Sequence, residues 1–439
     1  MARGAATATL RDMKRSRHQR TTDTPRGLPA PRQAVLQREL GPVLLTLYGL
    51  GTILGAGIYV VIGEVAGAAG LLTPVAFVLA ALVASLTALS FSELTARIPD
   101  AGGPVDYARE AFGRRGLCIA IGWGLAATGT VSAATILTGF ERYASLFVEL
   151  PALLTIALVT LALGGVAIAG MRESAWFMAI TTLLGIGGLA YVVWVAAPLM
   201  GDAPISIART LGEAVGDPGT GLLLGLFLGA FLAFYSFIGF EDMANLAEEV
   251  REVKRNLPRA IVAAVVTSLV IYALVAVAAT SVLAPDELAL AHAPLVAVVE
   301  ARDHPGEPLG LISLFIIVNG ALGQIIMATR LIMDMGRDRR GAPAMLGRVH
   351  PVTHTPVIAT VLVTTAVLVL ALFLPLKTLA NLTSTIMLAV FVTVNASLIV
   401  LKRRGQPEDV PNVPRWIPWL GLLLSLGALG AQALLAGLG

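Results

Sequence analysis

Eleven predominantly apolar runs, each of at least 20 residues, follow one another from Pro42 onward in this 439-residue chain. An α-helix needs about 20 apolar residues to cross the hydrocarbon core of a bilayer, so each run predicts a membrane-spanning helix. The runs occupy residues 42–66, 72–96, 117–147, 151–170, 175–199, 219–246, 258–283, 309–335, 356–376, 379–401 and 416–438. They predict an all-α integral membrane protein with about eleven transmembrane helices.

The composition excludes several other classes of protein. Charged residues make up 13% of the chain, against about 25% in soluble domains. The net charge is +3, but the charges cluster in short loops between apolar runs, which argues against a nucleic-acid partner. Cys118 is the only cysteine, so neither an intrachain disulfide nor a thiolate metal cluster is expected. No metal-binding, phosphate-binding or nucleophile motif is present, so we expect no metal, no cofactor and no enzymatic activity.

The basic residues predict the orientation of the chain. Residues 1–41 are basic and lack the continuous apolar core of a signal peptide, so we expect a disordered cytoplasmic tail; residues 42–439 then form one transmembrane domain. Of the 31 Lys and Arg residues, 27 fall on the side of this tail. The positive-inside rule therefore places the N-terminus in the cytoplasm and predicts a multi-pass protein of the cell (inner) membrane. Glu93, at the inner end of the second run, is expected to face a vestibule.

Glycines interrupt the first apolar run. The stretch GTILGAGIYV places Gly55 and Gly57 near its centre, although glycine is among the poorest helix formers. Unwound backbone inside a membrane is tolerated only where it is buried in protein or lines a polar cavity, so the stretch indicates a substrate site. The alternative is close helix packing through small residues, which is common in membrane bundles.

A second interruption occupies the sixth run, 219–246. Gly239 lies between the pair Tyr235–Ser236 and the pair Glu241–Asp242. The two interrupted runs are five helices apart, and because five is odd, a second set of five helices would start from the opposite face of the membrane. We therefore expect inverted repeats over about 42–199 and 219–401, with 416–438 as an accessory helix. Paired interrupted helices are typical of secondary-transporter sites.

The ends that an interruption exposes suggest the ligand. Free N–H groups near Gly57 suit a carboxylate, and the carbonyls around Ile53, like those from Tyr235 to Ile238, suit an ammonium group. Together they describe an α-amino acid. The predicted substrate-binding residues are Ile53, Leu54, Gly55, Ala56, Gly57, Ile58, Tyr235, Ser236, Ile238 and Gly239. Tyr235 and Phe240 are candidate gates, with ordinary packing as the alternative.

Three segments resemble the amino acid–polyamine–organocation (APC) superfamily of permeases. They are GTILGAGIYVVIG, SFIGFEDMANLAEEVREVKRNLPRAI and ATRLIMDMGRDRRGAPAMLGRVHPVTHTP. In that family the first helix carries a Gly-X-Gly break, the sixth Phe-X-Gly-Phe-Asp/Glu before Ala-Glu-Glu-Val, and the eighth ends in Ser/Thr-Arg…Arg-Asp. The resemblance implies a leucine-transporter-like five-plus-five inverted repeat with helices 1 and 6 discontinuous. Family members usually have twelve or more spans, so this chain is one short.

The resemblance also bears on coupling. In its proton-coupled branch a membrane lysine lies twelve residues after the Glu of a Glu-Ser-Ala motif. Counting from Glu173 gives Gly185, and no lysine lies in this run. Glu241 is then the candidate coupling residue, because a carboxyl at this depth is functional by default. Its neighbour Asp242 points about 100° away on a helix, so at most one of the two is expected to face the site.

These observations predict a permease for amino acids or related amines that works by alternating access. Protons remain a possible coupling ion, and uptake, exchange and facilitated diffusion all remain open, as does the substrate. Glu241 and Asp242 allow a cationic amino acid or an amine, while the apolar surroundings allow a neutral one. The alternative is a transporter-like sensor that binds an amino acid without moving it.

Overall fold

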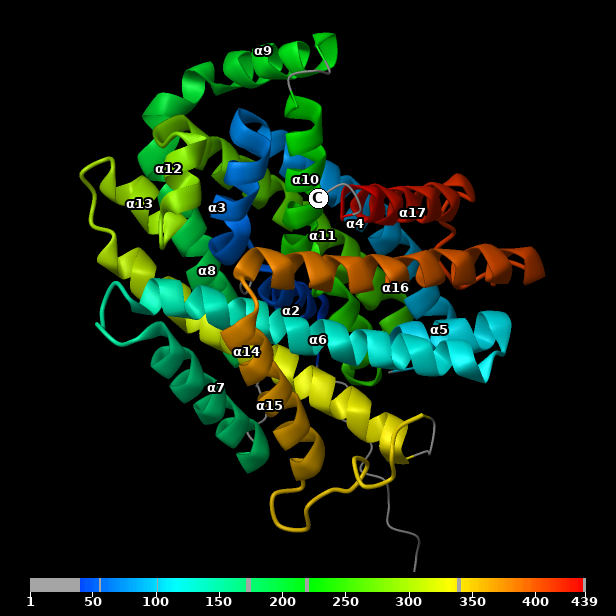
Figure 1. Cartoon of the computed structure of the whole chain (residues 1–439). Coiled ribbons are helices and arrows are strands. Elements are labelled where there is room, and N and C mark those ends of the chain that lie inside the picture. The colour runs from blue at the N-terminus through cyan, green and yellow to red at the C-terminus, as the bar shows by residue number, and fades with distance from the viewer. Residues whose placement is uncertain are drawn as a thin grey trace, which may run out of the picture. The chain divides into compact units, whose positions relative to one another are not determined.

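The computed structural model describes residues 40–54, 57–100, 102–170, 175–217, 221–337 and 341–436. The predicted tail lies almost wholly outside these ranges, and so do Gly55 and Ala56. Within them every extended element is a helix, as the apolar runs predict (Figure 1). The helices are α2 (Pro42–Leu54), α3 (Gly57–Ala69), η1 (Gly70–Leu72), α4 (Thr73–Arg97), α5 (Gly103–Phe112), α6 (Arg115–Ala144), α7 (Ala152–Ala169), α8 (Ala175–Ala196), η2 (Ala197–Asp202), α9 (Ala203–Gly216), α10 (Leu222–Phe234), η4 (Tyr235–Phe237), η5 (Phe240–Glu249), α11 (Val253–Val282), α12 (Pro285–Leu290), α13 (Pro294–Glu300), α14 (Glu307–Arg337), α15 (Val357–Phe373), α16 (Leu376–Arg404) and α17 (Trp416–Ala436).

Nine segments of the described chain are long and apolar enough to cross a membrane, which makes this a multi-pass membrane protein. They differ from the eleven predicted runs in two places. The first two predicted runs fall within one segment, Pro42–Arg97. The ninth predicted run, 356–376, corresponds to α15, an apolar helix that is too short to be counted among the nine segments. The count of eleven transmembrane helices therefore stays a prediction.

The outer helices present apolar side chains on their free faces. Leu161 on α7, Leu183 on α8 and Leu423 on α17 are each more than half exposed. In water such surfaces would associate, whereas lipid tails cover them at no cost, so these faces are the lipid-facing surface. The largest side chains buried inside are aromatic, among them Tyr59 and Tyr272.

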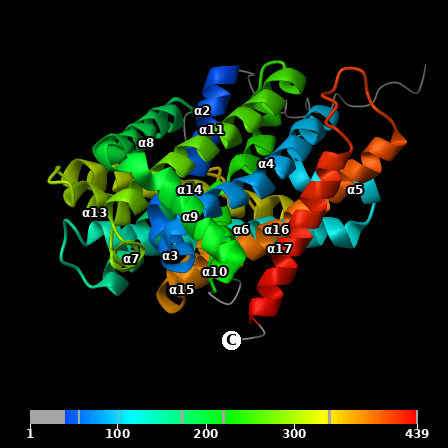
Figure 2. The same cartoon turned by 90° about the horizontal axis from the view of Figure 1, so that it is seen from above.

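The two short helices of the first run pack against different partners. The α2 helix lies against η5, while α3 lies against α10. Gly229 permits the second contact, because a Cβ there would lie 2.6 Å from the Cβ of Ala69. The α11 helix runs between α2 and α4 and packs against both (Figure 2).

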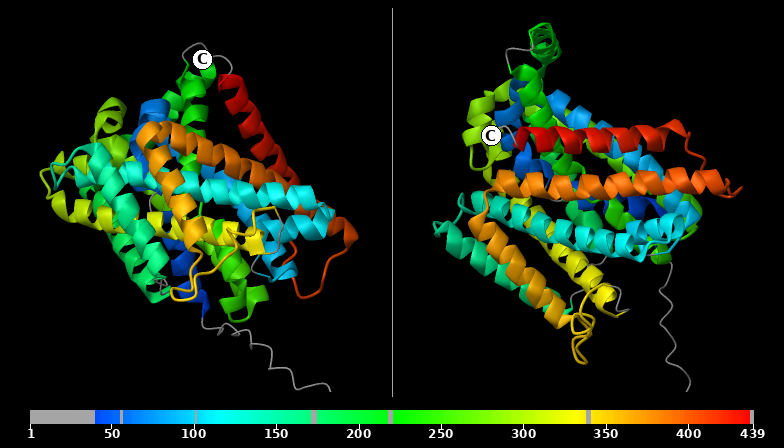
Figure 3. Two further views of the ribbon diagram at one scale, coloured as in Figure 1. Left: turned by 60° about the horizontal axis from the view of Figure 1, so that its bottom comes forward. Right: turned by 45° about the vertical axis from the view of Figure 1, so that its right-hand side comes forward.

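Two groups of helices surround these pairs. The α16 helix lies between α6 and α17 and contacts both of them (Figure 3). The α7 and α15 helices form a second neighbouring pair. The surrounding helices bury the interrupted segments, which is the condition under which non-helical backbone is tolerated inside a membrane.

Two backbone hydrogen bonds join the chain just before α2 to the chain at the end of η5. Leu40 N donates to the Glu249 carbonyl, and Arg251 N donates to the Leu40 carbonyl, each at 3.1 Å. These bonds form an isolated parallel bridge between Leu40 and Val250. Leu40, just before α2, is thereby held beside Val250, which follows η5.

Candidate functional site

The predicted first interruption falls on residues 55 and 56, between the described helices α2, which ends at Leu54, and α3, which begins at Gly57. Of the predicted binding residues here, Gly55 and Ala56 lie outside the described part of the chain. Ile53, Leu54 and Ile58 have side chains at most 1% exposed. The described ends of α2 and α3 are therefore inside the protein.

The second interruption, Ile238–Gly239, falls at the glycine predicted in the sixth run. The α10 helix ends at Phe234, a 3-10 turn follows, and Ile238 is extended. Gly239 has a φ of 129°, a left-handed value that favours glycine because it has no Cβ. The η5 helix then begins at Phe240. The backbone groups on both sides of Gly239 are thus free of regular helical pairing.

The two interruptions touch each other through their glycines. A Cβ on Gly57 would lie 2.6 Å from the Cα of Ser236 and 2.9 Å from its carbonyl oxygen. A Cβ on Gly239 would lie 2.6 Å from the carbonyl oxygen of Thr52. Each interruption therefore places a glycine directly on the backbone of the other, and neither position has room for a side chain.

Tyr272, on α11, bridges the two interruptions. Its hydroxyl donates to the carbonyl oxygen of Ile53 at 2.8 Å and to that of Ser236 at 3.1 Å. Its ring packs edge-to-face with Phe77 and Phe237, with centroids 5.9 and 5.1 Å away. The sequence prediction missed this residue. The available signal was a tyrosine within an apolar helix, where its hydroxyl needs a partner.

The other predicted residues of the second interruption are also buried. The Tyr235 hydroxyl lies 3.2 Å from the hydroxyl of Ser132, on α6. The hydroxyl of Ser236 is buried and has no hydrogen-bond partner within the described structure. Phe240 packs against Phe91 and Phe391, both with centroids 5.4 Å away. Each candidate gate therefore contacts a neighbouring helix.

The two carboxylates of η5 lie in different surroundings. Glu241 is 3% exposed and accepts a hydrogen bond from Gly239 N at 2.9 Å through Oε2, while its Oε1 has no partner. Asp242 accepts from Gln324 Nε2, on α14, at 3.4 Å. Among the described residues, no lysine or arginine forms an ion pair with either. Glu241 thus stabilises the second interruption, and Asp242 contacts a different element.

Gly185 is closely packed against α14, and only the end of one isoleucine side chain lies near the position of a Cβ. A Cβ there would lie 3.0 Å from Ile316 Cδ1, and the carbonyl of Gly185 accepts a hydrogen bond from the Tyr59 hydroxyl at 2.9 Å. Tyr59 in turn accepts at its carbonyl from Tyr143, at 3.0 Å. Two tyrosines therefore connect α3 to α6 and α8 beside Gly185, the position at which the proton-coupled branch of the APC superfamily carries a lysine.

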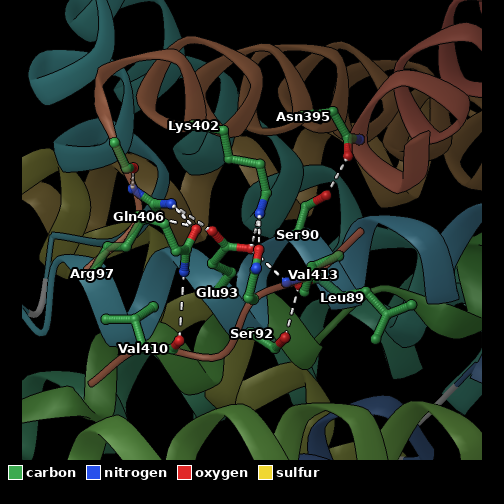
Figure 4. A network of polar contacts seen from close by, with 12 residues as sticks. Leu89, Ser90, Ser92, Glu93, Arg97, Asn395, Lys402, Gln406, Val410 and Val413 are labelled. Carbon is green, nitrogen blue, oxygen red and sulfur yellow. Dashed lines mark hydrogen bonds and ion pairs between the residues drawn. The ribbon is translucent and has the colours of Figure 1, made fainter. Parts of the chain in front are cut away.

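A buried ion cluster lies at the end of α4, remote in sequence from both interruptions (Figure 4). Glu93 is fully buried, and its Oε1 lies 2.7 Å from Arg97 Nη2. Its Oε2 lies 2.6 Å from Lys402 Nζ and accepts from Val413 N at 2.8 Å. The expectation that Glu93 faces a vestibule is therefore wrong, because two basic side chains and a backbone N–H surround its carboxylate.

Further bonds extend this cluster across three elements. Arg97 donates to the Gln406 side chain at 2.6 Å and to the Gly405 carbonyl at 3.1 Å. Asn395, on α16, accepts from the Ser90 hydroxyl at 2.7 Å. These bonds fasten α4 to α16 and to the segment that leads into α17.

Comparison with known proteins shows a match to the amino acid permease family over residues 40–436. An uncharacterized transporter of Mycobacterium tuberculosis (strain ATCC 25618 / H37Rv) is 32% identical over 425 residues, which cover 92% of this chain and 90% of the relative. The branched-chain amino acid permease BcaP of Bacillus subtilis (strain 168) is 28% identical, covering 89% and 87%. The vacuolar cationic amino acid transporter 4 of Arabidopsis thaliana is 28% identical, covering 86% and 65%.

Proposed function

Because this chain belongs to the amino acid permease family of the APC superfamily, we propose that it moves amino acids or related amines across the cell (inner) membrane by alternating access. It acts as a secondary active or facilitative transporter. The family and its characterised relatives are transporters rather than enzymes. The observation that supports the mechanism is the contact between the two interruptions, through Gly57 on Ser236 and Gly239 on Thr52.

The proposed architecture is the leucine-transporter-like five-plus-five inverted repeat. The repeats span about 42–199 and 219–401, and α17 is the accessory helix. The packing of α2 on η5 and of α3 on α10 supports this arrangement. Each half of one interrupted helix lies beside the opposite half of the other, as expected when two equivalent helices cross the membrane in opposite directions.

The proposed substrate site lies where the two interruptions meet. N–H groups at the start of α3 bind the substrate carboxylate, because the N-terminus of a helix attracts anions. The carbonyls of Ile53 and Ser236 bind its ammonium group. Glu241 and Asp242, which lack basic partners among the described residues, support a cationic substrate or an amine. The aromatic side chains of Phe237 and Phe240 support a neutral one.

Flux measurements separate a transporter from a sensor. The purified protein in liposomes should take up radiolabelled leucine or radiolabelled lysine with saturable kinetics, because an alternating site releases on the far side what it binds on the near side. Protein-free liposomes provide the background, and the two labels separate neutral from cationic substrates. Saturable binding of either label without flux would show that the protein is a sensor.

The same liposomes test coupling when a pH gradient is imposed. We expect uptake that does not depend on the gradient, because Gly185 stands in place of the lysine and Glu241 is already bonded to Gly239. If uptake does follow the gradient, Glu241→Gln should abolish that dependence. Proton-driven accumulation by both the native protein and Glu241→Gln would contradict both expectations, namely uptake that is independent of the gradient and proton coupling through Glu241.

The orientation is proposed from the distribution of basic residues, with the N-terminus in the cytoplasm and eleven spans. A reporter that is active only in the periplasm should therefore be active when it is fused after Gly439. The same reporter should be inactive when it is fused after Arg404, because one span separates the two positions. The reverse pattern would show that a transmembrane helix had been miscounted.

A further inference from the structure

Tyr272 places a single hydroxyl between two carbonyls that belong to different interrupted helices. Its oxygen lies 2.8 Å from the Ile53 carbonyl oxygen and 3.1 Å from that of Ser236. A hydroxyl has one proton to donate, so it is shared between the two carbonyls. The Ile53 carbonyl lies in the last described turn of α2, and the Ser236 carbonyl lies in the 3-10 turn after α10.

An ammonium nitrogen that bridges the same two carbonyls can occupy almost the same position. N–H···O bonds span about 2.7–3.2 Å, close to the distances that the Tyr272 oxygen now has. At that position the hydroxyl and the ammonium exclude each other. An ammonium group has three donors and a positive charge, and charge-assisted bonds are the stronger ones. A bound substrate amine consequently displaces the hydroxyl from at least one of the two carbonyls.

We propose that the Tyr272 hydroxyl substitutes for the substrate's ammonium group in the empty protein and so allows the unloaded transporter to return across the membrane. This proposal rests on the proposed transport function. It assigns to Tyr272 the role of a positioning residue, because the hydroxyl contacts the backbone of both interrupted helices. It also predicts that net transport occurs and that exchange is not obligatory.

The need for such a group follows from burial. When an empty site closes, the carbonyls of Ile53 and Ser236 leave water, and a buried carbonyl without a donor costs free energy. The Tyr272 hydroxyl meets both carbonyls at once. Its ring is fully buried and held between Phe77 and Phe237, so little conformational freedom is lost when the hydrogen bond forms.

The test is Tyr272→Phe, which removes the hydroxyl and keeps the ring. Net uptake of radiolabelled leucine or lysine, whichever the native protein transports, is measured into substrate-free liposomes. Exchange is measured with liposomes preloaded with the same amino acid. We expect net uptake to fall roughly fivefold, the equivalent of one neutral hydrogen bond, while exchange stays near the native rate. During exchange the substrate's own ammonium group supplies the bridge in both directions.

Substrate affinity gives a second measurement. General damage to the protein would weaken substrate binding, whereas the proposal predicts tighter binding. In Tyr272→Phe the substrate amine no longer competes with the hydroxyl, so binding should tighten, by up to roughly fivefold. The matched control is Tyr143→Phe. It also removes a buried tyrosine hydroxyl that donates to backbone, here the Tyr59 carbonyl in the first turn of α3 at 3.0 Å, without bridging the two interruptions. Its ratio of net uptake to exchange should equal the native ratio.

Two results would overturn the proposal. One is an equal loss of net uptake and exchange in Tyr272→Phe, and the other is weaker substrate binding by that variant. A native protein that transports neither label in either mode would contradict the proposed function itself. Native flux with an unchanged ratio in Tyr272→Phe would leave the transport function standing and defeat only the role of Tyr272.

Discussion

Replacing Gly57 with valine should weaken substrate binding roughly ten- to hundredfold, and transport with it, while the protein remains folded in the membrane. The valine Cβ would lie 2.6 Å from the Cα of Ser236, and backbone cannot move aside as the end of a flexible side chain can. The two interruptions must therefore separate. Overpacking of this kind costs about 1–3 kcal/mol, roughly a ten- to hundredfold loss of affinity if the strain falls on the bound state. Binding is measured on purified protein, and flux in liposomes.

Gly187→Val is the matched control for this prediction. Gly187 is an exposed glycine of α8, and a Cβ there meets nothing within 4 Å. The same β-branched side chain thus enters a membrane helix without touching the interruptions. We expect native binding and flux from this control. A folded Gly57→Val protein with native affinity would show that the substrate does not bind where the interruptions meet.

Glu93→Gln should destabilise the protein more than any other single change of a charged residue considered above. The substitution keeps the size of the side chain but leaves Lys402 and Arg97, whose side chains are 6% and 8% exposed, without their counter-charge. Removing one partner of a buried pair costs about 3–5 kcal/mol, because the remaining charge is buried and unpaired. Thermal unfolding of the detergent-solubilised protein should therefore begin at a much lower temperature.

The exposed pair of Arg209 and Glu213 provides the control for Glu93→Gln. These side chains are 81% and 54% exposed and one helical turn apart. Exposed pairs of this kind contribute about 0.3–0.5 kcal/mol, so Glu213→Gln should leave the unfolding temperature almost unchanged. Equal effects of the two substitutions would show that the Glu93 cluster contributes no more than a surface pair.

The interruption of the sixth run could be located from sequence because its cause is local. Gly239 alone tolerates the left-handed φ at that position, and the polar residues beside it mark where an apolar helix changes character. The all-helical fold could be predicted for a similar reason. Within lipid, each apolar run has to form its backbone hydrogen bonds internally, and a helix does this. The family could be recognised from three short segments of the sequence.

The contacts that complete the site could not be predicted, because their partners are distant in sequence. Tyr272 meets Ile53 across 219 residues, and nothing near either residue specifies the other. Glu93 was misplaced for the same reason. A buried carboxylate and one in a vestibule look identical until the fold brings a basic partner, here Lys402, beside it.

The Glu93 cluster also bears on the order in which the chain is assembled. The backbone N–H of Val413 that contacts Glu93 lies 320 residues later in the chain. At about 5–20 residues per second, this partner is synthesised on the order of half a minute after the carboxylate. Until then Arg97, one helical turn away, is the ion-pair partner of this carboxylate. The second ion pair, to Lys402, and the bond from Val413 N form only once α16 and the segment after it have been made.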